Sequence, residues 1–251
     1  MTADGAGTEN APSVDAGRFN EFPLMRVLAI DTALDACSAA VLDTASSSRA
    51  KSRSLPMVRG HAEALMPLIA TVMSDARTEF AELDRIAVTV GPGSFTGLRV
   101  GVAAARGIAL AAGKPVVGLT TLSAIAMPFI DADDSKALLV VIDARHEHVY
   151  MQLFGPGGRT LVAPRIAHLR DAIRAAMASP TRIVGNAAKL VEAAWPENER
   201  RPSLVSEVKA PDIVWIARLG AAADPDPASV KPLYLREADA HPQAAGVLPR
   251  Q

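Results

Sequence analysis

The stretch VTVGPGSFTGLRVG, residues 88–101, decides the fold of this chain. It continues an apolar run, turns through Gly91, Pro92 and Gly93, and leads into a segment of small and apolar residues that ends near Gly113. Glycines around a proline let a chain turn sharply between a buried strand and a helix. The stretch therefore predicts a strand over 85–90, a tight loop, and a helix over 96–113 packed closely onto a sheet.

The loop is also a candidate anion-binding site, formed by Gly91, Gly93, Ser94 and Thr96. Free N–H groups at a helix start can hold an anion, and Ser94 or Thr96 can cap the helix instead. The Lys-Ser/Thr pair of a Walker loop is absent, since Arg99 follows, and the glycines have one residue too many for G-x-G-x-x-G. We interpret the loop as a helix start rather than as a place of chemistry.

Strand and helix patterns alternate on both sides of this stretch. Segments 25–31, 36–43 and 49–58 are predicted strands, and 61–78 is a predicted helix. Strands followed by alternating helices and strands are typical of an α/β lobe, and the pattern repeats loosely after residue 130. We predict two similar lobes, divided as a disordered N-terminal tail over 1–24, a first, partner-binding lobe over 25–130, a second lobe over 131–238 and a flexible tail over 239–251.

Composition and charge exclude several classes of function. The chain carries 26 Lys and Arg against 27 Asp and Glu, so it has no overall attraction to nucleic acid. Aromatic residues make up only 4% of the sequence, so no platform for base stacking is evident. No apolar run reaches the ~18 residues of a membrane span. The single cysteine, Cys37, suits a reducing compartment, and together these features predict a cytoplasmic protein.

A basic strand and a histidine pair are two further candidate sites in the sequence. Arg49, Lys51 and Arg53 share one face of a predicted strand, either as an RNA-contacting ribbon or as the solvated side of an edge strand. The edge strand is the favoured interpretation. His146 and His148 also share a strand face, but Glu147 points to the other face and Asp143 is an odd number of residues from both histidines. No G-x-S-x-G motif is present. We predict no metal site and no catalytic residue.

Several blocks of the sequence carry a family resemblance. In order along residues 28–237 they are LAIDTALDACSAAVLD, HAEALMPLI, VTVGPGSFTGLRVGVAAARGIALAAGKPVVGLTTLSAIA, VIDARHEHVY and KPLYLRE. The chain resembles the TsaB family in all of them. The resemblance implies an α/β fold of two ribonuclease-H-like lobes, as in the actin-like ATPase superfamily.

The resemblance also implies a function. TsaB proteins are non-catalytic dimerisation or scaffold subunits of the bacterial complex that makes N6-threonylcarbamoyladenosine beside the tRNA anticodon. The expected partners are TsaD, which carries the catalytic site and forms a heterodimer, and the ATPase TsaE. The chain is expected to hold no cofactor of its own, although ATP or ADP binds in the complex. It is expected to form a homodimer when alone and to meet tRNA only through the complex.

Three positions depart from the family pattern. Ala33 stands where the family usually has Ser, His148 stands where a carboxylate is common, and the turn DTALD after Asp31 lacks the glycine of phosphate-binding members of the superfamily. Two alternatives are therefore kept beside the scaffold hypothesis. One is an actin-like ATPase or small-molecule kinase, and the other is a metal-dependent transferase or peptidase acting on its own.

The partner surface is predicted from two helices with more apolar surface than a core needs. On the 61–78 helix one stripe must face the sheet, which leaves a row containing Met66, Ala70 and Met73 for the partner. On the 96–113 helix small residues would let a partner helix approach closely, with two arginines at the rim. The predicted interface residues are His61, Met66, Ala70, Met73, Gly97, Arg99, Gly101, Ala104 and Arg106.

Overall fold

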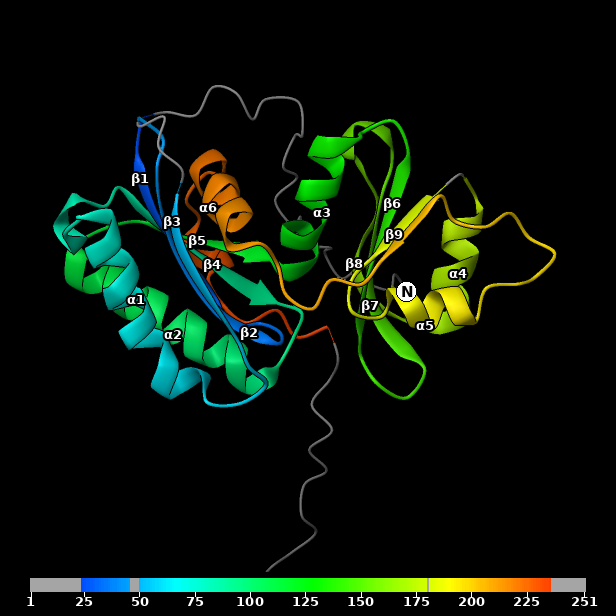
Figure 1. Cartoon of the computed structure of the whole chain (residues 1–251), viewed down its shortest axis with the longest axis horizontal. Coiled ribbons are helices and arrows are strands. Elements are labelled where there is room, and N and C mark those ends of the chain that lie inside the picture. The colour runs from blue at the N-terminus through cyan, green and yellow to red at the C-terminus, as the bar shows by residue number, and fades with distance from the viewer. Residues whose placement is uncertain (1–23, 46–49, 180, 236–251) are drawn as a thin grey trace, which may run out of the picture.

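The computed structural model describes residues 24–45, 50–179 and 181–235. They form two α/β units that lie side by side, each built on a five-stranded sheet (Figure 1). Outside the described residues lie the predicted N-terminal tail except Leu24, Arg49 of the basic strand, the last three residues of the predicted second lobe and the predicted C-terminal tail.

The first sheet has the strand order β3-β2-β1-β4-β5. Its central strand β1 is apolar on both faces, as a strand covered on both sides must be, whereas every residue of the edge strand β3 is exposed. Strand β1 is antiparallel to β2 and parallel to β4. The strands are β1 (Arg26–Asp31), β2 (Ala36–Asp43), β3 (Lys51–Pro56), β4 (Arg85–Gly91) and β5 (Val116–Thr120).

Helices cover both faces of this sheet. Leu28 and Ile30 of β1 contribute to a core cluster under α1 (His61–Ala76) and α2 (Phe95–Ala112). The alternate residues Val27 and Ala29 belong to a second cluster, which includes side chains of α3 (Thr121–Ala132) and α6 (Ile213–Ala222). Because successive side chains of a strand point to opposite faces, β1 connects the two layers of helices.

The second sheet repeats the topology of the first. Counted from β8, its order is β8-β7-β6-β9-β10. As in the first sheet, the strand that comes first in the sequence, here β6, lies in the middle and is antiparallel to the strand that follows it, β7. The elements are β6 (Ala137–Asp143), β7 (His148–Phe154), β8 (Thr160–His168), α4 (Leu169–Met177), β9 (Thr181–Val184), α5 (Ala188–Ala193) and β10 (Leu204–Ser206), with a short 3-10 turn at Pro156–Gly158. Two further 3-10 turns, Phe80–Glu82 and Pro227–Ser229, lie against α2 and β5 of the first unit. The prediction of two similar α/β lobes is thus confirmed.

The predicted boundary of the second lobe, 131–238, needs a correction. Helix α6 packs against β1, β2 and β4 of the first sheet, although it follows the whole second sheet in the chain. The Arg85 guanidinium donates to the carbonyl of Gly220 over 2.7 Å, and a Cβ on Gly220 would lie 2.3 Å from that of Ala87. The first sheet has a second apolar face that α1 and α2 do not cover, and α6 packs on this face.

Candidate partner-binding surface

The glycine loop is tied to the turn that follows β1. The Ser94 N–H donates to the Ala33 carbonyl over 2.8 Å, and a Cβ on Gly93 would lie 2.3 Å from the same oxygen. The Ser94 hydroxyl accepts a hydrogen bond from the Gly97 N–H at 3.3 Å and so caps α2. The close approach that the glycines allow is therefore to protein backbone, as expected for a helix start. Anion binding by Gly91, Gly93, Ser94 and Thr96 stays a prediction.

The small residues of α2 face inward, which corrects part of the predicted interface. A Cβ on Gly97 would lie 2.0 Å from the Thr32 carbonyl oxygen, and one on Gly101 would lie 2.4 Å from the Thr32 hydroxyl. That hydroxyl donates to the Gly97 carbonyl over 2.7 Å. Ala104 is half-buried against the core under α1 and α2. The stripe of glycines brings α2 onto the turn after β1, so it is not open to a partner helix.

Two predicted residues of α1 are also buried. Met73 is 5% exposed and belongs to the core cluster that contains Leu83 and Ile108. Met66 lies seven residues earlier, on nearly the same side of the helix, yet it is 49% exposed. Spacing gives the direction of a side chain but not how far the neighbouring elements extend along the helix. His61 is buried as well, with Nε2 3.3 Å from the Leu34 carbonyl.

The remaining predicted residues lie on the surface, with others that the sequence pattern did not single out. Met66, Ala70, Arg99 and Arg106 are exposed as predicted. The missed residues include Leu110, the most exposed large apolar side chain of the described chain at 86%. Arg99 and Arg106 mark the solvent side of α2, so a signal existed: residues at helical spacing from them share that side. We define the helix surface as Met66, Ala70, Phe95, Arg99, Ala103, Arg106 and Leu110.

A cluster of three residues at the start of α2, which we call the clasp, was also missed. Arg99 donates from Nε to the hydroxyl of Tyr234 over 3.1 Å, and its guanidinium carbon lies 3.7 Å above the ring of Phe95. The Phe95 and Tyr234 rings are 5.5 Å apart between centroids. The clasp consists of Phe95, Arg99 and Tyr234. Tyr234 comes from the KPLYLRE block, and the Leu233 N–H donates to the Val90 carbonyl over 2.7 Å, so this part of the predicted second lobe lies on the first.

A buried acid lies behind the glycine loop. Asp31 is completely buried at the end of β1, and its Oδ1 accepts hydrogen bonds from the Thr89 hydroxyl and from the Ala33 N–H at 3.2 Å. Oδ2 has no partner among the described residues. Burial raises the pKa of Asp31 to about 6, and burial followed by the charge of Asp31 raises the pKa of the Cys37 thiol to about 11.

This arrangement does not fit a nucleotide phosphate at Asp31. Thr32 is 1% exposed and Ala33 is fully buried, so the backbone turn that would approach a phosphate is covered by the glycine loop. The described ranges contain no group of three or more His, Cys, Asp or Glu placed to hold a metal ion. The buried acid is suited to holding the turn rather than to carrying out chemistry.

Helix α2 is long and apolar enough for a membrane span, although the sequence has no continuous apolar run of that length. By length and composition alone its 18 residues could cross a membrane. Core helices of soluble proteins pass the same test, and α2 buries seven of its residues against the first sheet.

Comparison with known proteins gives matches over most of the chain. The model of the family described as TsaD, tRNA N6-adenosine threonylcarbamoyltransferase, matches residues 56–210. The tRNA threonylcarbamoyladenosine biosynthesis protein TsaB of Escherichia coli (strain K12) is 32% identical over 155 residues, which span 58% of this chain and 66% of that protein. An uncharacterized protein of Mycobacterium tuberculosis (strain H37Rv) is 35% identical over 222 residues, 87% of this chain and 95% of its own length.

Solved structures agree with these matches. A crystal structure from Pseudomonas aeruginosa, described as an uncharacterized protein with similarity to peptidase YeaZ, superposes with a TM-score of 0.71 at 26% identity. The superposition covers 84% of this chain and all of the other. A second structure, YeaZ from the same organism, gives 0.69 at 24% identity. The fold is therefore the two-lobed, ribonuclease-H-like fold of the actin-like ATPase superfamily.

Proposed function

Because this chain belongs to the TsaB family, we propose that it is an accessory subunit in the biosynthesis of N6-threonylcarbamoyladenosine in tRNA. Its E. coli relative is named for that pathway, and the matched family model is described by the tRNA threonylcarbamoyltransferase TsaD. In this role the chain would act in the cytoplasm, bind TsaD as a heterodimer and support catalysis by TsaD and the ATPase TsaE.

The closed turn at Asp31 is the observation that carries the non-catalytic part of the proposal. An actin-like ATPase or kinase needs its phosphates to approach backbone at such a turn, and here Thr32 and Ala33 are buried under the glycine loop. Cofactor binding is accordingly assigned to the complex, where TsaD and TsaE would hold ATP or ADP. No contact among the described residues favours a separate ATPase, transferase or peptidase.

The helix surface and the clasp support partner binding. Leu110, Phe95 and Met66 are large apolar side chains, 86%, 52% and 49% exposed, on two helices that contact each other. Exposed apolar side chains gather at protein interaction sites, and aromatic and arginine side chains dominate the energy of such sites. The same face would form the homodimer when TsaD is absent, since a two-fold dimer uses one surface twice.

Reconstitution tests the proposal. Purified chain, TsaD and TsaE are incubated with unmodified tRNA and the precursors, and the modified nucleoside is measured by mass spectrometry with each protein left out in turn. We expect product only when the chain, TsaD and TsaE are all present. We expect no ATP hydrolysis by the chain alone. Full activity of TsaD and TsaE without the chain would contradict the accessory role, and robust ATP turnover by the chain alone would contradict the non-catalytic one.

A further inference from the structure

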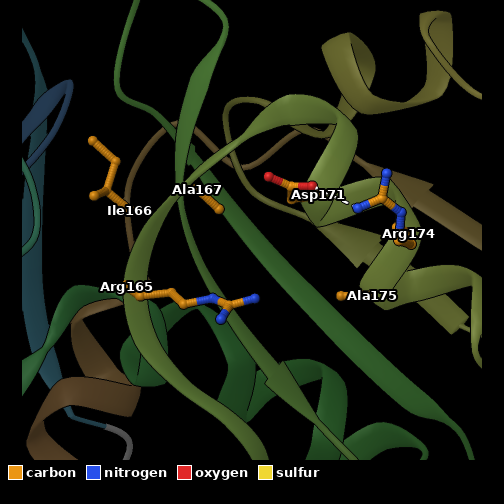
Figure 2. A pocket seen from close by; sticks show the side chains of 6 residues that line it. All are labelled: Arg165, Ile166, Ala167, Asp171, Arg174 and Ala175. Carbon is orange, nitrogen blue, oxygen red and sulfur yellow. Dashed lines mark hydrogen bonds and ion pairs between the residues drawn. The ribbon is translucent and has the colours of Figure 1, made fainter.

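A groove in the second lobe lies far from the helix surface. It has a volume of about 460 Å³ and runs between the edge strand β8 and helix α4, as Figure 2 shows. Arg165 extends into it from β8, and Arg174 lies on the opposite wall beside Asp171. In Figure 1, α4 is at one end of the molecule and α1 and α2 are at the other. A partner bound on α1 and α2 therefore leaves this groove open.

The groove has an excess of positive charge. Arg165 is exposed, and its side chain has no hydrogen bond or ion pair with any described residue. The same is true of Arg170, which lies one turn before Arg174 on α4 and so on the same side of the helix. Arg174 is paired with Asp171 at 2.9 Å, but both side chains are largely exposed. Exposed ion pairs contribute little free energy, so Arg174 can exchange this partner for another.

We propose that this groove binds phosphate groups of the tRNA backbone, with Arg165 and Arg174 of its lining as phosphate ligands and Arg170, beside the groove on α4, as a third. The proposal rests on the proposed function, which brings tRNA to the complex, and it replaces the expectation that tRNA is met only indirectly. The guanidinium group is planar, permanently charged and presents forked donors that match phosphate oxygens. The residues that line the groove include no aromatic ring on which a base could stack. Contacts to backbone phosphates carry no sequence information, so the binding would be independent of base sequence.

The basic edge strand of the first lobe is a poorer candidate and a good control. Arg53 donates two hydrogen bonds to Asp75, at 3.1 and 2.7 Å, and both side chains are less exposed than those of Arg174 and Asp171, so Arg53 is the more firmly paired arginine. This leaves Lys51 as the unpaired cation among the described residues that line the hollow on β3. Lys51 and Arg165 are both exposed cations on edge strands of five-stranded sheets, so Lys51→Glu makes the same change of charge as Arg165→Glu.

The test measures binding of a fluorescently labelled, unmodified tRNA transcript to the complex of the chain with TsaD and TsaE. Anisotropy titrations are run between 50 and 200 mM salt with the wild type, Arg165→Glu, Arg165→Glu/Arg170→Glu and Lys51→Glu. We expect the single groove variant to weaken binding about three- to tenfold, and the slope of log K against log salt to fall by about one for each lost phosphate contact. Lys51→Glu should stay within about twofold of the wild type.

Two results would overturn the proposal. Unchanged tRNA affinity of both groove variants would exclude the groove, and equal weakening by Lys51→Glu would show a general effect of charge. A loss of TsaD or TsaE binding in the groove variants, measured by size-exclusion chromatography, would show a protein site instead of an RNA site. The same titrations are repeated with the full chain alone at low salt, so that tRNA binding by the groove is measured independently of TsaD. Failure of the chain to bind TsaD would contradict the proposed function but not the groove.

Discussion

The hydroxyl of Tyr234 accepts a hydrogen bond from Nε of Arg99 at 3.1 Å, which joins two residues 135 positions apart. Tyr234 follows α6, the last α-helix among the described residues, and Arg99 lies in the first turns of α2. Their contact places the C-terminal KPLYLRE block at the edge of the helix surface. The surface proposed for TsaD therefore combines two helices with a segment that sequence order assigns to the other lobe.

The clasp gives a prediction for partner binding. Tyr234→Ala removes the ring that packs on Phe95 and the acceptor of Arg99, so the affinity for TsaD should fall by about 2 kcal/mol, roughly thirtyfold in Kd. Leu190→Ala, on α5 of the second lobe, removes a side chain of similar exposure and should have no effect. Isothermal titration calorimetry with TsaD compares the two. An unchanged Kd for Tyr234→Ala would place the interface away from the clasp.

Burial reverses the roles of Met73, a predicted interface residue, and Leu110, which the prediction missed. Leu110→Asp puts a charge on a side chain that is 86% exposed, so the chain should keep its melting temperature and lose binding to TsaD. Met73→Asp buries an unpaired carboxylate in the core and should lower the free energy of unfolding by several kcal/mol. Circular dichroism melts check both variants. A wild-type melt for Met73→Asp would show that this residue is exposed after all.

The glycines of α2 give a matched comparison. A Cβ at Gly101 would lie 2.4 Å from the Thr32 hydroxyl, so Gly101→Ala should lower the free energy of unfolding by about 1–3 kcal/mol through overpacking. Gly107 is in the same helix, and a Cβ there would meet nothing within 4 Å. Gly107→Ala should raise the free energy of unfolding by about 0.5–1 kcal/mol, because alanine restricts the unfolded chain. Urea denaturation of both variants tests the assignment, which fails if both are stabilising.

The buried acid predicts a dependence of stability on pH. The pKa of Asp31 is raised from 3.8 to about 6 by burial, so the folded state binds the proton more tightly than the unfolded state. The contribution of Asp31 is therefore most favourable below about pH 4, declines as the pH rises towards 6, and stays lower above it. A shift of about two units corresponds to roughly 3 kcal/mol.

Asp31→Asn removes this ionisation while keeping an oxygen that can accept from Thr89. Its free energy of unfolding relative to the wild type should increase by up to about 3 kcal/mol between pH 4 and pH 8. Denaturant titrations across this range measure the difference. A difference that does not change with pH would mean that Asp31 is ionised at little cost in the folded chain.

Local signals in the sequence determined much of the first lobe. The turn around Gly91 and Gly93, the cap at Ser94 and the stop at Gly113 were all predictable, because each depends on a few neighbouring residues and their backbone preferences. The edge position of β3 was also predictable, since Lys51 and Arg53 alternate with small polar residues. Such features need no knowledge of the rest of the molecule.

Only the tertiary structure decided which surfaces are available. Gly97 and Gly101 have a spacing that suits a partner helix or a backbone turn equally well, and the turn at Thr32 occupies them. Met66 and Met73 lie on nearly the same side of α1 but differ in exposure, because the elements that cover this side reach Met73 and not Met66. Tyr234 meets Arg99 because α6 returns to the open face of the first sheet and carries the C-terminal segment with it. Periodicity specifies the direction of a side chain from its own backbone, whereas its neighbours come from distant parts of the chain and are set by how the layers of the fold pack.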